Sequence, residues 1–155
     1  MRRFALPCLV LLSACSASGG PGGVGFDNLR GDMVEKDALS LYKGKEWRCG
    51  ETADDFRHLG QQVCGAEQVD FDGLNATNLS FFFRDGKLAS ATVEYGTADF
   101  APVLKALDAA HQRGNGNEGE RMVWQVKDGL AFGKASARRN GHPFVIWNSA
   151  AEAAH

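Results

Sequence analysis

The sequence predicts an α+β domain in which an antiparallel sheet of about five strands packs against two or three helices and carries one disulfide. Two observations lead to this fold class. Runs of alternating apolar and polar residues are separated by Asp-Gly or Asn-Gly pairs, which favour tight hairpin turns. Helix signals occur before and between these runs, as in α+β domains. The folded part is expected to span residues 26–149, the size of one domain with a single core.

The first half of this region carries two helix signals. Asp32 and Glu35 form a capping-box arrangement, so a helix is expected to begin there and to end at Gly44. Residues 52–55 supply a second start signal, and apolar residues follow at helical spacing as far as Val63. The two helices are therefore expected to precede the sheet.

The pattern then changes to strands. Residues 79–84 alternate in polarity, Asp85-Gly86 suits a type I′ turn, and residues 87–95 return as a second strand. A third helix is predicted over residues 100–110, where apolar residues recur at helical spacing. Three further strands are expected at 122–126, 130–137 and 144–147, with turns at 128–129 and 140–141, and residues 150–155 are expected to form a frayed tail.

The N-terminal residues predict a secretory signal. Met1-Arg2-Arg3 provides positive charge, residues 4–12 are apolar, and small residues precede Cys15. The apolar run is about half of the roughly 20 residues that a membrane span needs. The pattern resembles the lipobox of bacterial lipoproteins, which implies that residues 1–14 are removed and that Cys15 is acylated. The alternative is an ordinary secretory signal in which Cys15 has no such role.

Residues 15–25 are rich in Gly and Ser and predict a flexible tether with an r.m.s. span of roughly 17–19 Å. The resemblance implies that the lipid on Cys15 attaches the chain to a membrane. Gram-negative lipoproteins that stay at the inner membrane usually carry Asp after the acylated cysteine, and this chain carries Ser16. The resemblance therefore implies the inner leaflet of the outer membrane, facing the periplasm.

Two further cysteines, Cys49 and Cys64, predict a disulfide in an oxidising compartment. The loop between them would be about 15 residues long, and its closure would stabilise the domain by roughly 3 kcal/mol. A redox or metal pair is the alternative, but the spacing is far from C-x-x-C and no histidine lies at a zinc-ligand interval. A structural disulfide is therefore expected.

Charge and motifs argue against an enzyme and against nucleic acid. The whole chain has a formal charge of −2, and loss of Arg2 and Arg3 with the signal would make it −4. Residues 114–119 match G-x-G-x-x-G but follow a helix and precede a strand, the reverse of the dinucleotide context. Residues 70–73 lack the full acidic pattern of a calcium loop and are expected to form a solvated turn. The sequence predicts no catalytic residue, no cofactor and no metal site.

Aromatic residues on the predicted strands suggest a protein-binding surface. Phe82 lies between two other phenylalanines, so a strand must place it on the face opposite to theirs. Trp124 and Trp147 also lie on predicted strands, and such residues are enriched at interfaces. Phe82, Trp124 and Trp147 are therefore candidates for a partner surface. The alternative is that they belong to the hydrophobic core, and an edge strand that accepts a partner strand is a related hypothesis.

The helix opening at Gly31-Asp32-Met33 and the strands around residues 81–95 resemble small periplasmic α+β lipoproteins. This group includes the small lipoprotein subunit of the β-barrel assembly machinery and β-lactamase-inhibitor-like repeats. The resemblance implies a non-catalytic envelope module that binds a protein or assists assembly. An inhibitor or immunity lipoprotein that blocks a periplasmic hydrolase or toxin is the alternative function.

Overall fold

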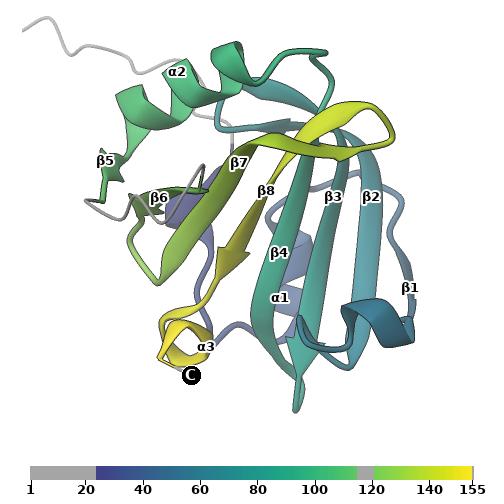
Figure 1. The fold of residues 1–155 in the computed structure, drawn as a ribbon. Helices are drawn as coiled ribbons and strands as arrows, with labels where there is room; N and C mark the ends of the chain where they lie inside the picture. The colour runs from purple at the N-terminus through teal and green to yellow at the C-terminus, as the bar shows by residue number, and fades with distance from the viewer. Residues whose placement is uncertain (1–23, 115–120, 155) are drawn as a thin grey trace, which may run out of the picture.

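The computed structural model describes residues 24–114 and 121–154 of the chain, and most of this part is β-sheet. One antiparallel sheet has eight strands in the order β1-β2-β3-β4-β8-β7-β6-β5 and is strongly twisted (Figure 1). The strands are β1 (Arg48–Glu51), β2 (Gln62–Phe71), β3 (Leu74–Arg84), β4 (Lys87–Tyr95), β5 (Gln112–Arg113), β6 (Arg121–Gln125), β7 (Leu130–Arg139) and β8 (His142–Asn148). The helices are α1 (Glu35–Ser40), α2 (Phe100–Ala110) and α3 (Ala150–Ala153), with 3-10 turns η1 (Phe26–Asn28) and η2 (Asp54–Phe56).

The predicted α+β class with about five strands is therefore wrong, because the sheet has eight strands and the first two predicted helices are shorter than expected. The helix expected after residues 52–55 forms only the single turn η2, and β2 begins at Gln62. Gly60 lies against the backbone of Phe83, where a β-carbon would be 2.9 Å from the nitrogen and oxygen. Strand β2 pairs with β3 along its whole length, and these tertiary hydrogen bonds outweigh the local helix signal.

The predicted hairpins in the second half are confirmed. Strands β3 and β4 are joined at Asp85-Gly86, and β7 and β8 are joined at Asn140-Gly141. A third hairpin joins β2 to β3 at Asp72-Gly73. In each turn both residues have positive φ, between 50° and 83°, which Asp, Asn and Gly tolerate better than other residues. Helix α2 also occupies the residues predicted for it.

The core fills the inner face of the twisted sheet. Segments from η1, α1 and α2 lie against this face, and α1 is seen behind β3 and β4 in Figure 1. The outer face of β3 and β4 is also buried, because the η2 segment and the β7–β8 hairpin meet over it. The guanidinium of Arg139 lies 5.4 Å from the centre of the Phe56 ring at this meeting point. The two central strands are therefore covered on both sides.

The predicted disulfide is present. Cys49 and Cys64 lie directly opposite each other on β1 and β2, and their sulfur atoms are 2.04 Å apart. The bond links the edge strand β1 to its neighbour across 15 positions of the sequence. It therefore holds a strand of four residues, all of them exposed, on the sheet.

The C-terminal residues form α3, where a frayed tail was expected. The Ser149 side chain accepts a hydrogen bond from the Glu152 backbone N–H at 3.4 Å and so caps this helix. Glu152 also pairs with Arg84 of β3 at 3.4 Å. These two contacts give the segment a fixed position at the foot of β4 and β8 (Figure 1).

Candidate functional site

The predicted partner surface is buried, so that prediction is wrong. Phe82 is 3% exposed, and Trp124 and Trp147 are not exposed at all. Trp124 donates its indole N–H to Asp108 at 2.7 Å, and Trp147 donates its own to the Asp128 carbonyl at 2.7 Å. The strand does place Phe82 opposite its neighbours, but Gly60 and the η2 segment cover that face. These aromatics are core residues and offer no surface to a partner.

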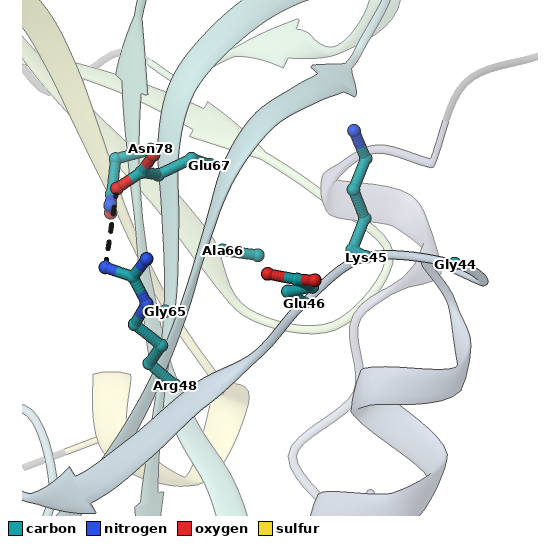
Figure 2. Close-up of a pocket in the computed structure, with 8 residues that line it drawn as sticks. All are labelled: Gly44, Lys45, Glu46, Arg48, Gly65, Ala66, Glu67 and Asn78. Atoms are coloured by element: carbon teal, nitrogen blue, oxygen red, sulfur yellow. Dashed lines mark ion pairs between the residues drawn. The ribbon is translucent and has the colours of Figure 1, made fainter.

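A polar hollow lies at the edge of the sheet beside β2 (Figure 2). Its volume is about 380 Å³, and Gly65 and Ala66 of β2 form part of its lining. Arg48 reaches toward Glu67 and Asn78, and its guanidinium is 4.0 Å from the Glu67 carboxylate (Figure 2). Both of these charged side chains are largely exposed, so the pair contributes little stability and is free to contact a partner.

A second hollow of about 560 Å³ continues along the same strand, with Lys45 in the lining of both. Strand β1 pairs only with residues 62–65 of β2, so no described strand pairs with residues 66–71 on that side. The Lys45 ammonium donates a hydrogen bond to the Gln68 carbonyl, which lies on this open stretch. We call residues 66–71 the open edge of β2. A strand edge of this kind can bind an extended peptide through backbone hydrogen bonds.

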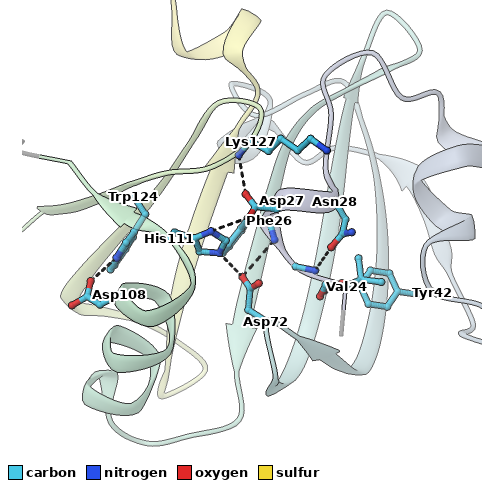
Figure 3. A network of polar contacts seen from close by, with 11 residues as sticks. Val24, Phe26, Asp27, Asn28, Tyr42, Asp72, Asp108, His111, Trp124 and Lys127 are labelled. Carbon is cyan, nitrogen blue, oxygen red and sulfur yellow. Dashed lines mark hydrogen bonds and ion pairs between the residues drawn. The ribbon is translucent and has the colours of Figure 1, made fainter. Parts of the chain in front are cut away.

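A second polar centre surrounds His111 on the inner side of the sheet (Figure 3). His111 follows α2, and its side chain is 2% exposed. Its Nε2 atom lies 3.2 Å from Oδ2 of Asp72, in the β2–β3 turn, and its Nδ1 atom lies 3.5 Å from Oδ2 of Asp27, in η1. The imidazole thus joins three segments that are far apart in the sequence.

This environment favours the charged form of His111. The hydrogen bond to Asp72 raises the pKa of His111 above its usual value of 6.5, and the negative charges of Asp72 and Asp27 act in the same direction against the effect of burial. The position after the C-terminus of α2 favours a cation as well. Because both ring nitrogens face carboxylates, neither is available to activate a nucleophile. The centre is a charged structural cluster and not a catalytic triad.

The same cluster holds residues 24–29, which we call the N-terminal strap. The Val24 carbonyl accepts hydrogen bonds from the Asp72 N–H at 3.2 Å and from the Tyr42 hydroxyl at 3.1 Å. The Phe26 N–H donates to Asp72 at 3.4 Å, and its side chain is completely buried against Phe71. The predicted tether residue Gly25 is buried here as well, so the fold begins at least one residue earlier than expected.

The described residues include one group of three side chains that resembles a metal site. A carboxylate oxygen of Glu35 and the sulfurs of Cys49 and Cys64 lie within 4.8 Å of one another. The two sulfurs are bonded to each other, so they are not thiolate ligands. A carboxylate in this position also disfavours a thiolate, which opposes thiol–disulfide exchange. The group fits a structural disulfide better than a metal or redox centre.

Sequence reasoning missed both polar centres. His111 carried only a weak signal as a cation at a helix terminus, and Asp72 was expected in a solvated turn. The turn exists, but the Asp72 side chain is 10% exposed because it faces the imidazole. The two residues are 39 positions apart, and no motif of short range joins them. The open edge of β2 could not be predicted either, because β1 and most of β2 were not recognised as strands.

Cys15 and residues 15–23 of the predicted tether lie outside the described residues. No helix among residues 24–114 and 121–154 is long and apolar enough to cross a membrane. Comparisons with family models, with curated proteins and with solved structures find no match for this chain. The resemblance to small periplasmic lipoproteins therefore stays a prediction.

Proposed function

We propose that this chain is a lipid-anchored module of a bacterial cell envelope that binds another protein and has no catalytic activity. In this proposal Cys15 carries the lipid, the outer membrane holds it, and the domain faces the periplasm. The proposed location rests on the N-terminal sequence, in which positive charge, an apolar run and small residues precede Cys15. The Cys49–Cys64 disulfide suits the oxidising compartment that this location implies.

The strap supports the anchoring part of the proposal. A tether from Cys15 would join the domain at Val24, whose carbonyl is held by Asp72 and Tyr42. Phe26 and Leu29 are completely buried just after this point. The junction between tether and domain is therefore one of the well-packed parts of the fold, as a module held by its N-terminus requires.

The open edge of β2 supports the binding part. It combines unpaired strand backbone with exposed charged side chains from Lys45, Arg48 and Glu67. Such an edge suits an extended peptide segment, because backbone groups supply affinity and the flanking charges supply specificity. The polar hollows beside it are open and shallow, and the His111 cluster is occupied by internal contacts. Protein binding is therefore favoured over turnover of a small substrate.

The anchor is tested by metabolic labelling with an alkyne analogue of palmitate in a Gram-negative host. The full chain is expected to take up the label and to fractionate with the outer membrane. The Cys15→Ala variant should lose the label, whereas the matched Cys8→Ala variant, changed inside the predicted signal, should keep it. Label that persists in Cys15→Ala would show that Cys15 is not the residue that carries the lipid.

The binding surface is tested by placing a photo-crosslinking amino acid at single positions of the full chain. Position 67, on the open edge of β2, is expected to give a discrete cross-linked product in cells, and position 105, exposed on α2, serves as the control. The product should weaken when an unlabelled copy of the full chain is co-expressed in excess. Equal products at both positions, or none at position 67, would count against a binding site at this edge. A periplasmic hydrolase as the cross-linked protein would identify an inhibitor.

A further inference from the structure

We propose that His111 is a charged clamp, and that its deprotonation releases the N-terminal strap, residues 24–29, from the sheet. The inference concerns the domain itself and holds whether or not the chain is anchored at Cys15. It goes beyond protein binding because it makes the junction at Val24 sensitive to pH. It rests on the arrangement of three side chains from three separate segments.

The geometry suits the doubly protonated imidazole. Nε2 faces Asp72 at 3.2 Å and Nδ1 faces Asp27 at 3.5 Å. A neutral imidazole has one N–H donor, so its other nitrogen would direct a lone pair at a carboxylate oxygen. The imidazolium has two donors and satisfies both carboxylates at once. His111 therefore links the strap, through Asp27, to the β2–β3 turn, through Asp72 (Figure 3).

Two tyrosines and two other charged residues lie around the clamp. Tyr42 and Tyr95 lie near Asp72, and burial raises the pKa of both hydroxyls, so they stay neutral. Asp108 is paired with Arg113 on the far side of α2. Lys127 meets Asp27 through its backbone N–H at 2.8 Å, which does not titrate. His111, which faces both carboxylates, is therefore the group on which the proposed pH response depends.

Loss of the proton should act locally. Asp27 would then keep its bond from the Lys127 N–H and Asp72 its bond from the Phe26 N–H, but the ion pairs of both carboxylates with the imidazolium would be lost. The strap is joined to the sheet by this cluster, by the bonds of the Val24 carbonyl and by the side chains of Phe26 and Leu29. Strands β3 and β4 are instead held by ladders on both sides. The strap should therefore open before the central strands do.

The test is hydrogen exchange of the full chain in detergent micelles, followed by mass spectrometry from about pH 6 to about pH 10 with correction for the intrinsic rate. Peptides that cover residues 26–29 are expected to exchange about tenfold faster as pH rises through the pKa of His111, while peptides from β3 and β4 stay protected. In parallel, nitrogen NMR of the imidazole should show both ring nitrogens protonated at about pH 6, below the usual pKa of histidine.

Three variants decide the result. His111→Gln is expected to remove the pH step and to leave the strap in fast exchange throughout. His142→Gln is the matched control, because His142 contacts the Thr97 carbonyl outside the cluster and should leave the step unchanged. If His111→Gln does not fold, Asp27→Asn replaces it. The Asp27 side chain is 53% exposed, so loss of its charge should disturb the fold less. Asp27→Asn should lower the pKa of His111 and move the step to lower pH.

A neutral His111 ring at about pH 6 would overturn the proposal. An unchanged step in both His111→Gln and Asp27→Asn would do the same, and so would a step that appears in β3 and β4 at the same pH as in the strap. The last result would mean that alkaline pH unfolds the domain as a whole.

Discussion

Gly25 packs so closely on Asp72 that a β-carbon at position 25 would lie 1.8 Å from Oδ1 of that residue. Gly25 therefore lacks a side chain because Asp72 occupies the space, although its sequence context suggests only a flexible tether. We expect Gly25→Ala to lower the free energy of unfolding by about 1–3 kcal/mol, the usual cost of overpacking. The matched control is Gly50→Ala, because the space around Gly50 is open. Urea unfolding should give a lower midpoint for the first variant and a nearly unchanged one for the second.

The Cys49–Cys64 disulfide should contribute about 3 kcal/mol to stability, because it closes a loop across 15 positions in the unfolded chain. The Cys49→Ala, Cys64→Ala double variant removes the bond without leaving a free thiol. Its urea midpoint should fall to that of the reduced parent protein, and reductant should have no further effect on it. Two free thiols in the untreated parent, counted by alkylation and mass, would contradict the disulfide.

Two buried tyrosines near the strap should respond differently to loss of their hydroxyl groups. Tyr42 donates to the Val24 carbonyl at 3.1 Å, so Tyr42→Phe should cost about 1 kcal/mol. The Tyr95 hydroxyl is buried with no hydrogen-bond partner among the described residues, so Tyr95→Phe should leave stability unchanged or raise it. Thermal unfolding of the two variants checks this order. A larger loss in Tyr95→Phe would reveal a partner, such as a bound water, for its hydroxyl.

Asp72 and Asp70 offer a matched pair for the electrostatic role of the β2–β3 turn. Asp72→Asn should cost about 1–3 kcal/mol near neutral pH, because the buried imidazolium loses its nearest charge. Asn accepts the positive φ of this position, so the turn itself should survive. Asp70 is exposed, and Asp70→Asn should change stability by less than about 0.5 kcal/mol. Equal effects in chemical unfolding would mean that the turn, and not the pairing with His111, matters.

The pH dependence of stability has a defined sign. The pKa of His111 is raised in the folded state, chiefly by the hydrogen bond to Asp72. Its contribution is therefore fully present below the unfolded value of about 6.5 and is lost as pH rises through the folded value. Urea midpoints measured across this window should fall with rising pH, and His111→Gln should flatten the curve. A midpoint that rises with pH over the same window would contradict a stabilising imidazolium.

Local signals in the sequence predicted the elements that depend on local chemistry. Asp85-Gly86 and Asn140-Gly141 mark hairpins because few other residue pairs adopt two successive positive φ values. The 3.6-residue periodicity over residues 100–110 predicted α2 for a similar reason, since the pattern lies within the element itself. The pairing of Cys49 with Cys64 could be predicted because these are the two cysteines in the expected domain.

The features that the sequence predicted wrongly depend on contacts between distant residues. The helix predicted to follow residues 52–55 is replaced by the start of strand β2, because β2 forms hydrogen bonds with β3 along its whole length. Phe82 and Trp147 resemble interface residues in the sequence, yet both are buried. Gly60 packs against Phe82, and Trp147 donates its indole N–H to the Asp128 carbonyl. An alternating sequence shows that the two faces of a strand differ in polarity. It does not show whether other segments cover both faces.

By itself the sequence determined the tight turns, one long helix, the disulfide partners and the expectation of a lipid anchor at Cys15. Only the tertiary structure decided that β1 pairs with β2 no further than Gly65 and leaves an edge of β2 open, and that His111 meets Asp72 and Asp27. The physical reason is range. Turn and helix preferences act over a few residues, whereas burial and ion pairing act between segments that only the folded sheet brings together.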